Sequence, residues 1–173
     1  MNQAINVQFA TFNQLTPNQL YTMLMQCVHV PRWAEDIEQQ RPFADREALL
    51  EYAKKHAQSW TWEEVLSALE THPRIGERQA KVQLSEKEAQ FSEQEQAALK
   101  LEEETLEALY KGNVAYEKKF RFIFLIRAAG RSSEEILTAL HYRLVNDLYT
   151  EKRIVHQQLA EIALLRLEKE VDA

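Results

Sequence analysis

Glycine and proline are scarce in this chain, and their scarcity constrains its fold more than any other feature of the sequence. Only 3 glycines and 4 prolines occur among 173 residues. A β-rich protein of this length needs many tight turns, which draw on these residues, whereas a helical protein needs few. Hydrophobic residues make up 45% of the chain and charged residues 28%, which is typical of a globular domain. We therefore expect an all-α fold, in which residues 1–173 form a single-domain bundle of about seven to nine helices.

The charge balance and the cysteine count exclude several classes of protein. A net charge of -6 argues against general nucleic-acid binding, which needs a basic surface. No apolar run reaches the length of a membrane span, and residues 1–15 lack the basic and apolar segments of a signal peptide. The single Cys27 excludes an internal disulfide and a CxxC metal site. The expectation is a cytoplasmic protein with neither a membrane nor a nucleic acid as partner.

Capping residues and hydrophobic periodicity predict the helices of the first half. In the helix that begins near residue 62, Val65, Leu66 and Leu69 are expected to be buried. The expected N-terminal caps are Thr16 (followed by Pro17), Asp45, and Thr61 in a capping box with Glu64.

The second half is predicted to be helical as well. One long helix should run from Ser92, its expected cap, to Gly112, and another from there to Gly130. Residues 119–130, KFRFIFLIRAAG, also fit a short strand, but no partner strand is evident, so an irregular helix is the prediction. For the polar residues 77–90 two predictions stand, a loop throughout or a loop with a turn of helix after Ser85. Two more helices are predicted over 132–147 and 150–170.

The sequence THPRIGER, residues 71–78, places a histidine directly before a proline. A residue before proline is disfavoured in a helix, so His72 should end a helix or open a loop, and Gly76 should allow a turn. One interpretation is a helix stop that happens to contain a histidine. The other is an exposed loop that presents an imidazole for chemistry, and the motif alone favours the first.

A second polar stretch, FSEQEQAAL, covers residues 91–99. Ser92 and Glu95 have the spacing of a capping box, which is a structural role. A helix N-terminus also binds anions and polar ligands, so Glu95 and Gln96 are candidates for holding a ligand there.

Arg166 is the third candidate, because it lies on an apolar helical line with Val155, Leu159 and Ile162. The commoner outcome for such an arginine is a packed stem with its head in water. The alternative is a guanidinium directed into a pocket to hold a carboxylate.

Sequence motifs for cofactor or metal chemistry are absent. There is no glycine-rich phosphate loop, no G-x-S-x-G motif and no H-E-x-x-H motif, and the five histidines are scattered. If the chain is an enzyme, we expect it to use acid–base and electrostatic catalysis without a cofactor or a metal.

Four blocks in order, THPRIGE, SEQEQAAL, NVAYEKKFRFIFLIRAAGRS and IALLRL, resemble the family of 2-oxo-4-hydroxy-4-carboxy-5-ureidoimidazoline (OHCU) decarboxylases. RWAEDIEQQRPFAD resembles the N-terminal segment of the same family, so the likeness covers nearly the whole chain. These enzymes perform the last step from urate to (S)-allantoin. The resemblance implies an all-α homodimer without a cofactor, acting on a small ureidoimidazoline.

The resemblance also implies roles for particular residues. His72 would be the catalytic acid or base, with Glu95 beside it in the catalytic set and Pro73 bordering the substrate. Ser92, Glu95 and Gln96 would bind the ring and ureido groups, and Arg166 would meet the anionic side of the substrate. A further segment would supply backbone contacts and a wall: Phe124, Leu125, Ile126, Arg127 and Ala128.

Two other functions remain open from the residues alone. One is a hydrolase of a related ureido compound, in which Glu95 activates water. The other is a non-enzymatic helical binding domain, which would have an exposed apolar groove and no need for His72.

Overall fold

A computed structural model describes residues 7–76, 86–96 and 103–173, apart from some side chains of the helix over 86–96, that of Gln96 among them. The described residues form nine helices and one pair of two-residue strands, which confirms the all-α prediction. In chain order the elements are β1 (Val7–Gln8), α1 (Phe9–Phe12), α2 (Pro17–Cys27), α3 (Pro31–Gln40), α4 (Arg46–Ala57), α5 (Trp62–Leu69), α6 (Glu86–Gln96), α7 (Glu103–Phe120), α8 (Ser133–Leu144), α9 (Leu148–Glu170) and β2 (Val171–Asp172).

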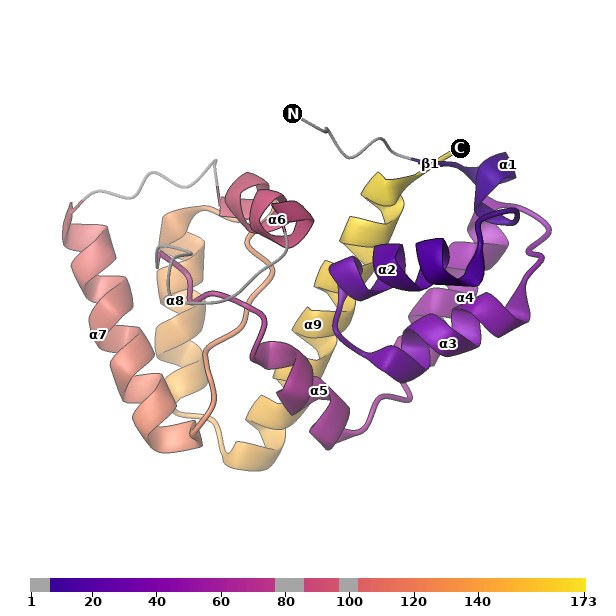
Figure 1. The fold of residues 1–173 in the computed structure, drawn as a ribbon. Helices are drawn as coiled ribbons and strands as arrows, with labels where there is room; N and C mark the ends of the chain where they lie inside the picture. The colour runs from indigo at the N-terminus through magenta and orange to yellow at the C-terminus, as the bar shows by residue number, and fades with distance from the viewer. Residues whose placement is uncertain (1–6, 77–85, 97–102) are drawn as a thin grey trace.

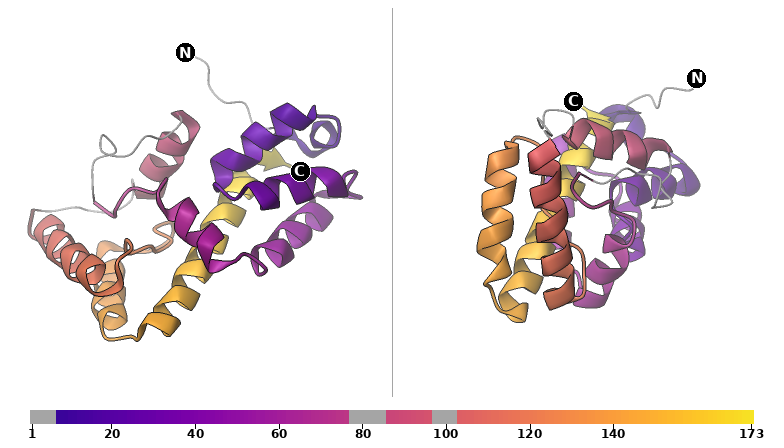
Figure 2. Two further views of the ribbon diagram at one scale, coloured as in Figure 1. Left: turned by 60° about the horizontal axis from the view of Figure 1, so that its bottom comes forward. Right: turned by 90° about the vertical axis from the view of Figure 1, so that its left-hand side faces the viewer.

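The long helix α9 runs through the middle of the molecule and organises the rest of it (Figure 1). Helices α2, α4 and α5 pack against it, and α3 packs on α2 and α4. Helices α7 and α8 pack on each other on the other side of α9, as both views in Figure 2 also show. The parallel pairing of Val7 with Val171 joins the two ends of the described chain. None of the described helices is long and apolar enough to cross a membrane.

The predicted helix starts of the first half are confirmed. Thr16 and Thr61 each accept a hydrogen bond in a complete capping box, and the Asp45 side chain accepts from the backbone N–H of Ala48. Leu66 is the exception to the predicted burial, because it is 39% exposed. It lies about 100° around the helix from Val65, outside the buried stripe of α5.

Gly112 does not end a helix, contrary to the prediction. Helix α7 runs through it, and a Cβ at this position would overlap the side chain of Leu140 in α8. The glycine therefore serves the close packing of α7 on α8.

The predicted cap at Ser92 is also wrong, since α6 begins at Glu86 and Ser92 lies in its interior. Residues 86–90 are helical, as in the alternative with a turn of helix after Ser85, while residues 77–85 lie outside the described residues.

Residues 121–130 are not helical, which corrects the prediction for KFRFIFLIRAAG. Helix α7 stops where Arg121 adopts a left-handed φ of 69°. Phe122 and Phe124 then both pack on Tyr116, at ring centroid distances of 5.9 and 5.3 Å. Residues two apart point the same way in extended chain but not in a helix, so an extended path lets both rings reach Tyr116.

Side chains from α8 and α9 satisfy backbone groups of this extended segment, which belongs to no strand among the described residues. Arg143 Nη1 donates to the carbonyl of Leu125 at 2.7 Å, and Gln158 Oε1 accepts from the N–H of Arg127 at 2.9 Å. Arg143 is itself held by Glu151, which is fully buried and accepts from Arg143 Nε at 2.7 Å. The segment is thus fixed by a buried charge pair.

Candidate active site

His72 lies in the turn after α5, where its backbone N–H donates to the carbonyl of Leu69 at 3.0 Å. Its imidazole is buried, with only 7% of the residue exposed, so the interpretation as an exposed loop histidine is wrong. Nε2 of this imidazole is buried and has no hydrogen-bond partner among the described residues. A buried, unpartnered nitrogen is uncommon, which makes Nε2 of His72 a candidate for contact with a ligand.

The surroundings of His72 keep its imidazole neutral. Burial lowers the pKa of His72 well below its ordinary 6.5, and the charges of Arg166 and His29 lower it further. At neutral pH the side chain is therefore a base that can accept a proton.

Arg166 is buried, with 3% of the residue exposed, and pairs with Glu95 from α6. Nε and Nη2 of the guanidinium lie 3.1 and 3.0 Å from the two carboxylate oxygens of Glu95, which is a bidentate arrangement. Nη1 lies 3.4 Å from the carbonyl oxygen of Cys27, and the guanidinium covers the ring of Phe91 at 5.2 Å. The alternative of an arginine head in water is excluded.

Helix α6 brings Ser92 to the same region. Ser92 is 4% exposed and lies one turn before Glu95, on the face of α6 that is directed inward. Glu95 does not act in a capping box, because its carboxylate pairs with Arg166 in the interior. The predicted role of Gln96 concerns a side chain outside the described residues.

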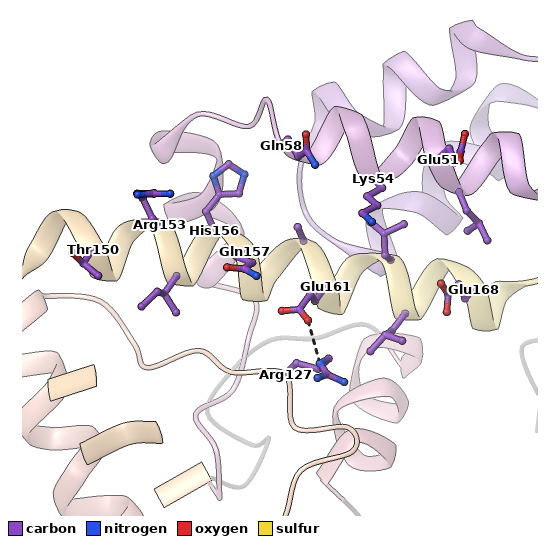
Figure 3. Close-up of a pocket in the computed structure, with 15 residues that line it drawn as sticks. Glu51, Lys54, Gln58, Arg127, Thr150, Arg153, His156, Gln157, Glu161 and Glu168 are labelled. Atoms are coloured by element: carbon purple, nitrogen blue, oxygen red, sulfur yellow. Dashed lines mark ion pairs between the residues drawn. The ribbon is translucent and has the colours of Figure 1, made fainter. Parts of the chain in front are cut away.

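The remaining predicted residues divide into two groups. Pro73 and the side chains of Phe124, Leu125, Ile126 and Ala128 are buried. The side chain of Arg127 instead lines a groove of about 1140 Å³ along α9, and it does so from the side of this helix opposite to α4, where its Nε lies 3.6 Å from Glu161 (Figure 3). Glu161 is about 140° around α9 from Arg166, so the Arg127 guanidinium and Arg166 are on different sides of this helix.

Arg143 and Glu151, which hold the segment over 121–130 in place, are not among the residues predicted from the sequence. Both could have been found by the pattern that indicated Arg166, a charged residue on an otherwise apolar line of a helix. Arg143 shares an apolar line with Ile136 and Leu140 in α8, and Glu151 precedes Val155 by one turn in α9.

The charge of Arg166 acts on the neutral imidazole of His72, and Arg166 is paired with the carboxylate of Glu95. A base, a guanidinium and a carboxylate of this kind are groups that bind polar ligands and move protons. Among the described residues, no three His, Cys, Asp or Glu side chains are grouped so that they could hold a metal ion.

Comparison with known proteins identifies relatives over most of the chain. A model of the OHCU decarboxylase family matches residues 13–168. The 2-oxo-4-hydroxy-4-carboxy-5-ureidoimidazoline decarboxylase of Haloferax volcanii is 30% identical over 139 residues, which cover 80% of either chain.

Two longer relatives are bifunctional proteins of uric acid degradation. The one from Arabidopsis thaliana is 35% identical over 105 residues, and the one from Bacillus sp. is 26% identical over 161 residues. The matches cover 60% and 91% of this chain but 32% and 31% of those proteins, so this chain spans about a third of their length.

Two solved structures have a similar fold. A crystal structure of OHCU decarboxylase in the presence of (S)-allantoin is 28% identical, with a TM-score of 0.67 over 83% of this chain and 92% of that one. A crystal structure of (S)-allantoin synthase has a TM-score of 0.71 over 96% of this chain and 55% of that one, and at 18% identity it supports the fold alone.

Proposed function

This chain belongs to the OHCU decarboxylase family, and we propose that it converts 2-oxo-4-hydroxy-4-carboxy-5-ureidoimidazoline to (S)-allantoin, with His72 as the acid–base group. Family membership makes the chain a carboxy-lyase of urate degradation. The observation that carries the proposed role of His72 is its buried, neutral imidazole, whose Nε2 has no partner among the described residues and which lies within the electrostatic reach of Arg166.

The substrate suits the donors and acceptors of the Arg166–Glu95 pair. It carries one carboxylate, a hydroxyl on the same carbon, and several N–H groups on its ring and ureido arm. A guanidinium has five N–H donors, and described partners use three of those of Arg166. The others would donate to the anionic side of the substrate, and the carboxylate of Glu95 would accept from its N–H groups.

The reaction needs no electron acceptor outside the substrate. As the carbon–carboxylate bond breaks and CO₂ leaves, its electron pair moves into the adjoining C=N bond, whose nitrogen gains a proton. The hydroxyl proton is then lost as the carbonyl of the product forms, and a proton adds to the neighbouring carbon. One proton is taken up overall for each carboxylate anion that is consumed.

His72 would move the protons that determine the product. In its neutral form it would accept the hydroxyl proton and return it to the carbon on one face of the ring, which sets the (S) configuration. Burial supports this role, because it excludes water that would deliver the proton to either face.

The segment over 124–128 would form the wall opposite the imidazole. Its backbone is extended and its Leu125 carbonyl and Arg127 N–H are already held by α8 and α9, so the wall is rigid. Because these two groups are already used, the backbone contacts to the substrate would come from other N–H and carbonyl groups of the segment, whose positions the rigid wall fixes in advance. Ser92 and Gln96 would complete the binding of the ureido arm, and Pro73 would border the ring.

The hydrolase alternative is less well supported. Both carboxylate oxygens of Glu95 accept from Arg166, which favours a role in holding N–H groups over a role in activating water.

The alternative of a non-enzymatic binding domain is also less well supported. The groove along α9 is lined by charged as well as apolar side chains, so it differs from the apolar groove that a binding domain would need.

A homodimer and a cytoplasmic location are further parts of the proposal. Light scattering coupled to gel filtration tests the first, and a mass near that of one chain, 20.3 kDa, would contradict it.

A circular-dichroism time course on freshly generated substrate tests the function. The protein should speed the appearance of the (S)-allantoin signal, with one CO₂ released per molecule. Release of urea or ammonia, with the carboxylate of the substrate retained in the product, would support the hydrolase. An unchanged, slow conversion to racemic product would contradict catalysis altogether.

A further inference from the structure

Helix α6 presents one face to the rest of the molecule. Glu88, Phe91, Ser92 and Glu95 follow the spacing i, i+3, i+4, i+7, and the first three are no more than 5% exposed. Helix α2 packs against α6. Within this stripe, the carboxylates of Glu88 and Glu95 lie two turns apart, near the two ends of the helix.

The carboxylate near the start of α6 meets a histidine that the proposed reaction leaves unused. Nε2 of His29 lies 2.7 Å from Oε2 of Glu88. The His29 side chain is 36% exposed and that of Glu88 is 7% exposed, so the pair lies at the boundary between the protein interior and solvent.

The position of His29 connects this pair to the proposed site. His29 lies between α2 and α3, two residues after Cys27, whose carbonyl oxygen lies 3.4 Å from Arg166 Nη1. The charge of His29 also acts on His72 in the same direction as that of Arg166.

We propose that His29 is a positioning residue of this active site, which holds the first turn of α6 through Glu88 and thereby places Ser92 and Glu95 opposite His72 and Arg166. The inference rests on the proposed function for its catalytic consequence, though not for the holding of α6. Arg166 anchors the last turn of the helix through Glu95, and His29 anchors the first.

Loss of the His29 contact should affect substrate affinity rather than the chemical step. If α6 is docked in only a fraction of the molecules, the apparent affinity falls by that fraction, while saturating substrate selects the docked form. KM should therefore rise and kcat should stay nearly constant.

Hydrogen exchange measured by mass spectrometry tests the holding of α6 without reference to activity. In His29→Ala, exchange in peptides covering 86–96 should be about tenfold faster, the factor that corresponds to about 1.4 kcal/mol. Peptides covering α9 should be unchanged. A matched control is His56→Ala, which removes another histidine–carboxylate contact of 2.7 Å, to Asp36, between α4 and α3. It should leave exchange in 86–96 as it is.

Kinetics test the consequence for the site. His29→Ala should raise KM about tenfold, on the scale of one hydrogen bond to a charged group, with kcat within about twofold. The double variant His29→Ala/Glu88→Ala should be no worse than the worse single variant, because the two residues act as one contact.

His29→Gln separates geometry from charge. It keeps an N–H donor for Glu88, so KM and exchange should return close to those of the unaltered protein. It removes a positive charge near His72, Arg166 and Glu88, so the acid limb of the kcat/KM profile should move to higher pH, as it should in His29→Ala.

Four results would overturn the inference. Unchanged exchange in 86–96 would show that His29 does not hold α6, and additive losses in the double variant would show that the two residues do not act together. Faster exchange with normal KM would show that the placement of α6 does not matter for binding. A fall in kcat at constant KM would make His29 part of the chemistry instead. If the unaltered protein proves to have no decarboxylase activity, the proposed function fails, and the exchange experiment still decides whether His29 holds the helix.

Discussion

The guanidinium of Arg166 meets both carboxylate oxygens of Glu95, with Nε at 3.1 Å and Nη2 at 3.0 Å, and 71 residues of chain separate the two. Both side chains are largely shielded from water, at 4% and 12% exposure. The pair joins the central helix α9 to α6 and forms the charged part of the proposed substrate site.

Glu95→Gln tests the strength of this pair. The substitution leaves a buried guanidinium without its counter-charge, so the free energy of unfolding should fall by about 3 kcal/mol. Glu135→Gln is the matched control, because Glu135 belongs to a genuine capping box with Ser132 at the start of α8. There glutamine can replace glutamate, and the loss should stay below about 1 kcal/mol. Urea denaturation measures both, and equal small losses would mean that the Glu95 pair contributes little.

Arg166→Lys tests the anion-binding role. Lysine keeps the charge but cannot hold Glu95 and a second carboxylate with planar, paired donors. Carboxylate-bearing substrate analogues should bind more weakly by about 1.5–3 kcal/mol, while neutral ring analogues should be nearly unaffected. Isothermal titration calorimetry measures both classes. Arg153→Lys, in the exposed groove on the same helix, serves as the control. Equal small losses for both classes would place the anion site elsewhere.

The depressed pKa of His72 predicts how stability depends on pH. Below pH 6.5 the unfolded chain binds a proton at His72 that the folded chain does not, so stability rises with pH and is lost as the pH falls below 6.5. For each unit that the pH falls below 6.5, His72 should lower the free energy of unfolding by at most about 1.4 kcal/mol. Urea denaturation at several pH values between 7.5 and 5 should show a shallower loss for His72→Asn than for the unaltered protein. Parallel curves would contradict a neutral, buried His72.

Arg143→Met tests the buried pair that fixes the segment over 121–130. The substitution removes the counter-charge of the fully buried Glu151 carboxylate and the donor to the Leu125 carbonyl. We therefore expect the free energy of unfolding to fall by about 3–5 kcal/mol. Tyr116 still donates to Glu151 at 2.5 Å, which should keep the loss near the lower figure. Thermal and urea unfolding measure it. A loss below about 1 kcal/mol would mean that aromatic packing alone holds the segment.

Local signals in the sequence predicted the first half of the fold well. Thr16, Asp45 and Thr61 act as caps because each of these interactions spans only three residues. The resemblance to the OHCU decarboxylase family is confirmed. The apolar line through Arg166 also predicted a buried face correctly, although periodicity alone could not decide between water and an interior partner.

The failures of prediction arise where distant residues decide the local structure. Ser92 and Glu95 have capping-box spacing, but Arg166 from another helix binds Glu95. Gly112 would end a helix on its own, but Leu140 of α8 needs the space that a side chain would fill. No local sequence pattern indicated a role for His29, because its partner Glu88 lies far along the chain.

The helix prediction for residues 121–130 was wrong for the same reason. Its composition fits a helix or a strand, yet the anchors that decide its path, Arg143 and Gln158, come from α8 and α9. Such contacts are a property of the assembled fold, and no window of local sequence contains them.

The acid–base role of His72 is the central claim, and the formation of optically active allantoin by His72→Asn tests it most directly. The substitution should lower the rate of (S)-allantoin formation by about 10² or more, the usual contribution of a general acid–base group. Circular dichroism in the far ultraviolet should confirm that the variant is folded, and His141→Asn, which replaces an exposed histidine, should behave like the unaltered protein. The account predicts slow conversion to nearly racemic product by folded His72→Asn. Rapid formation of (S)-allantoin by this variant would contradict it.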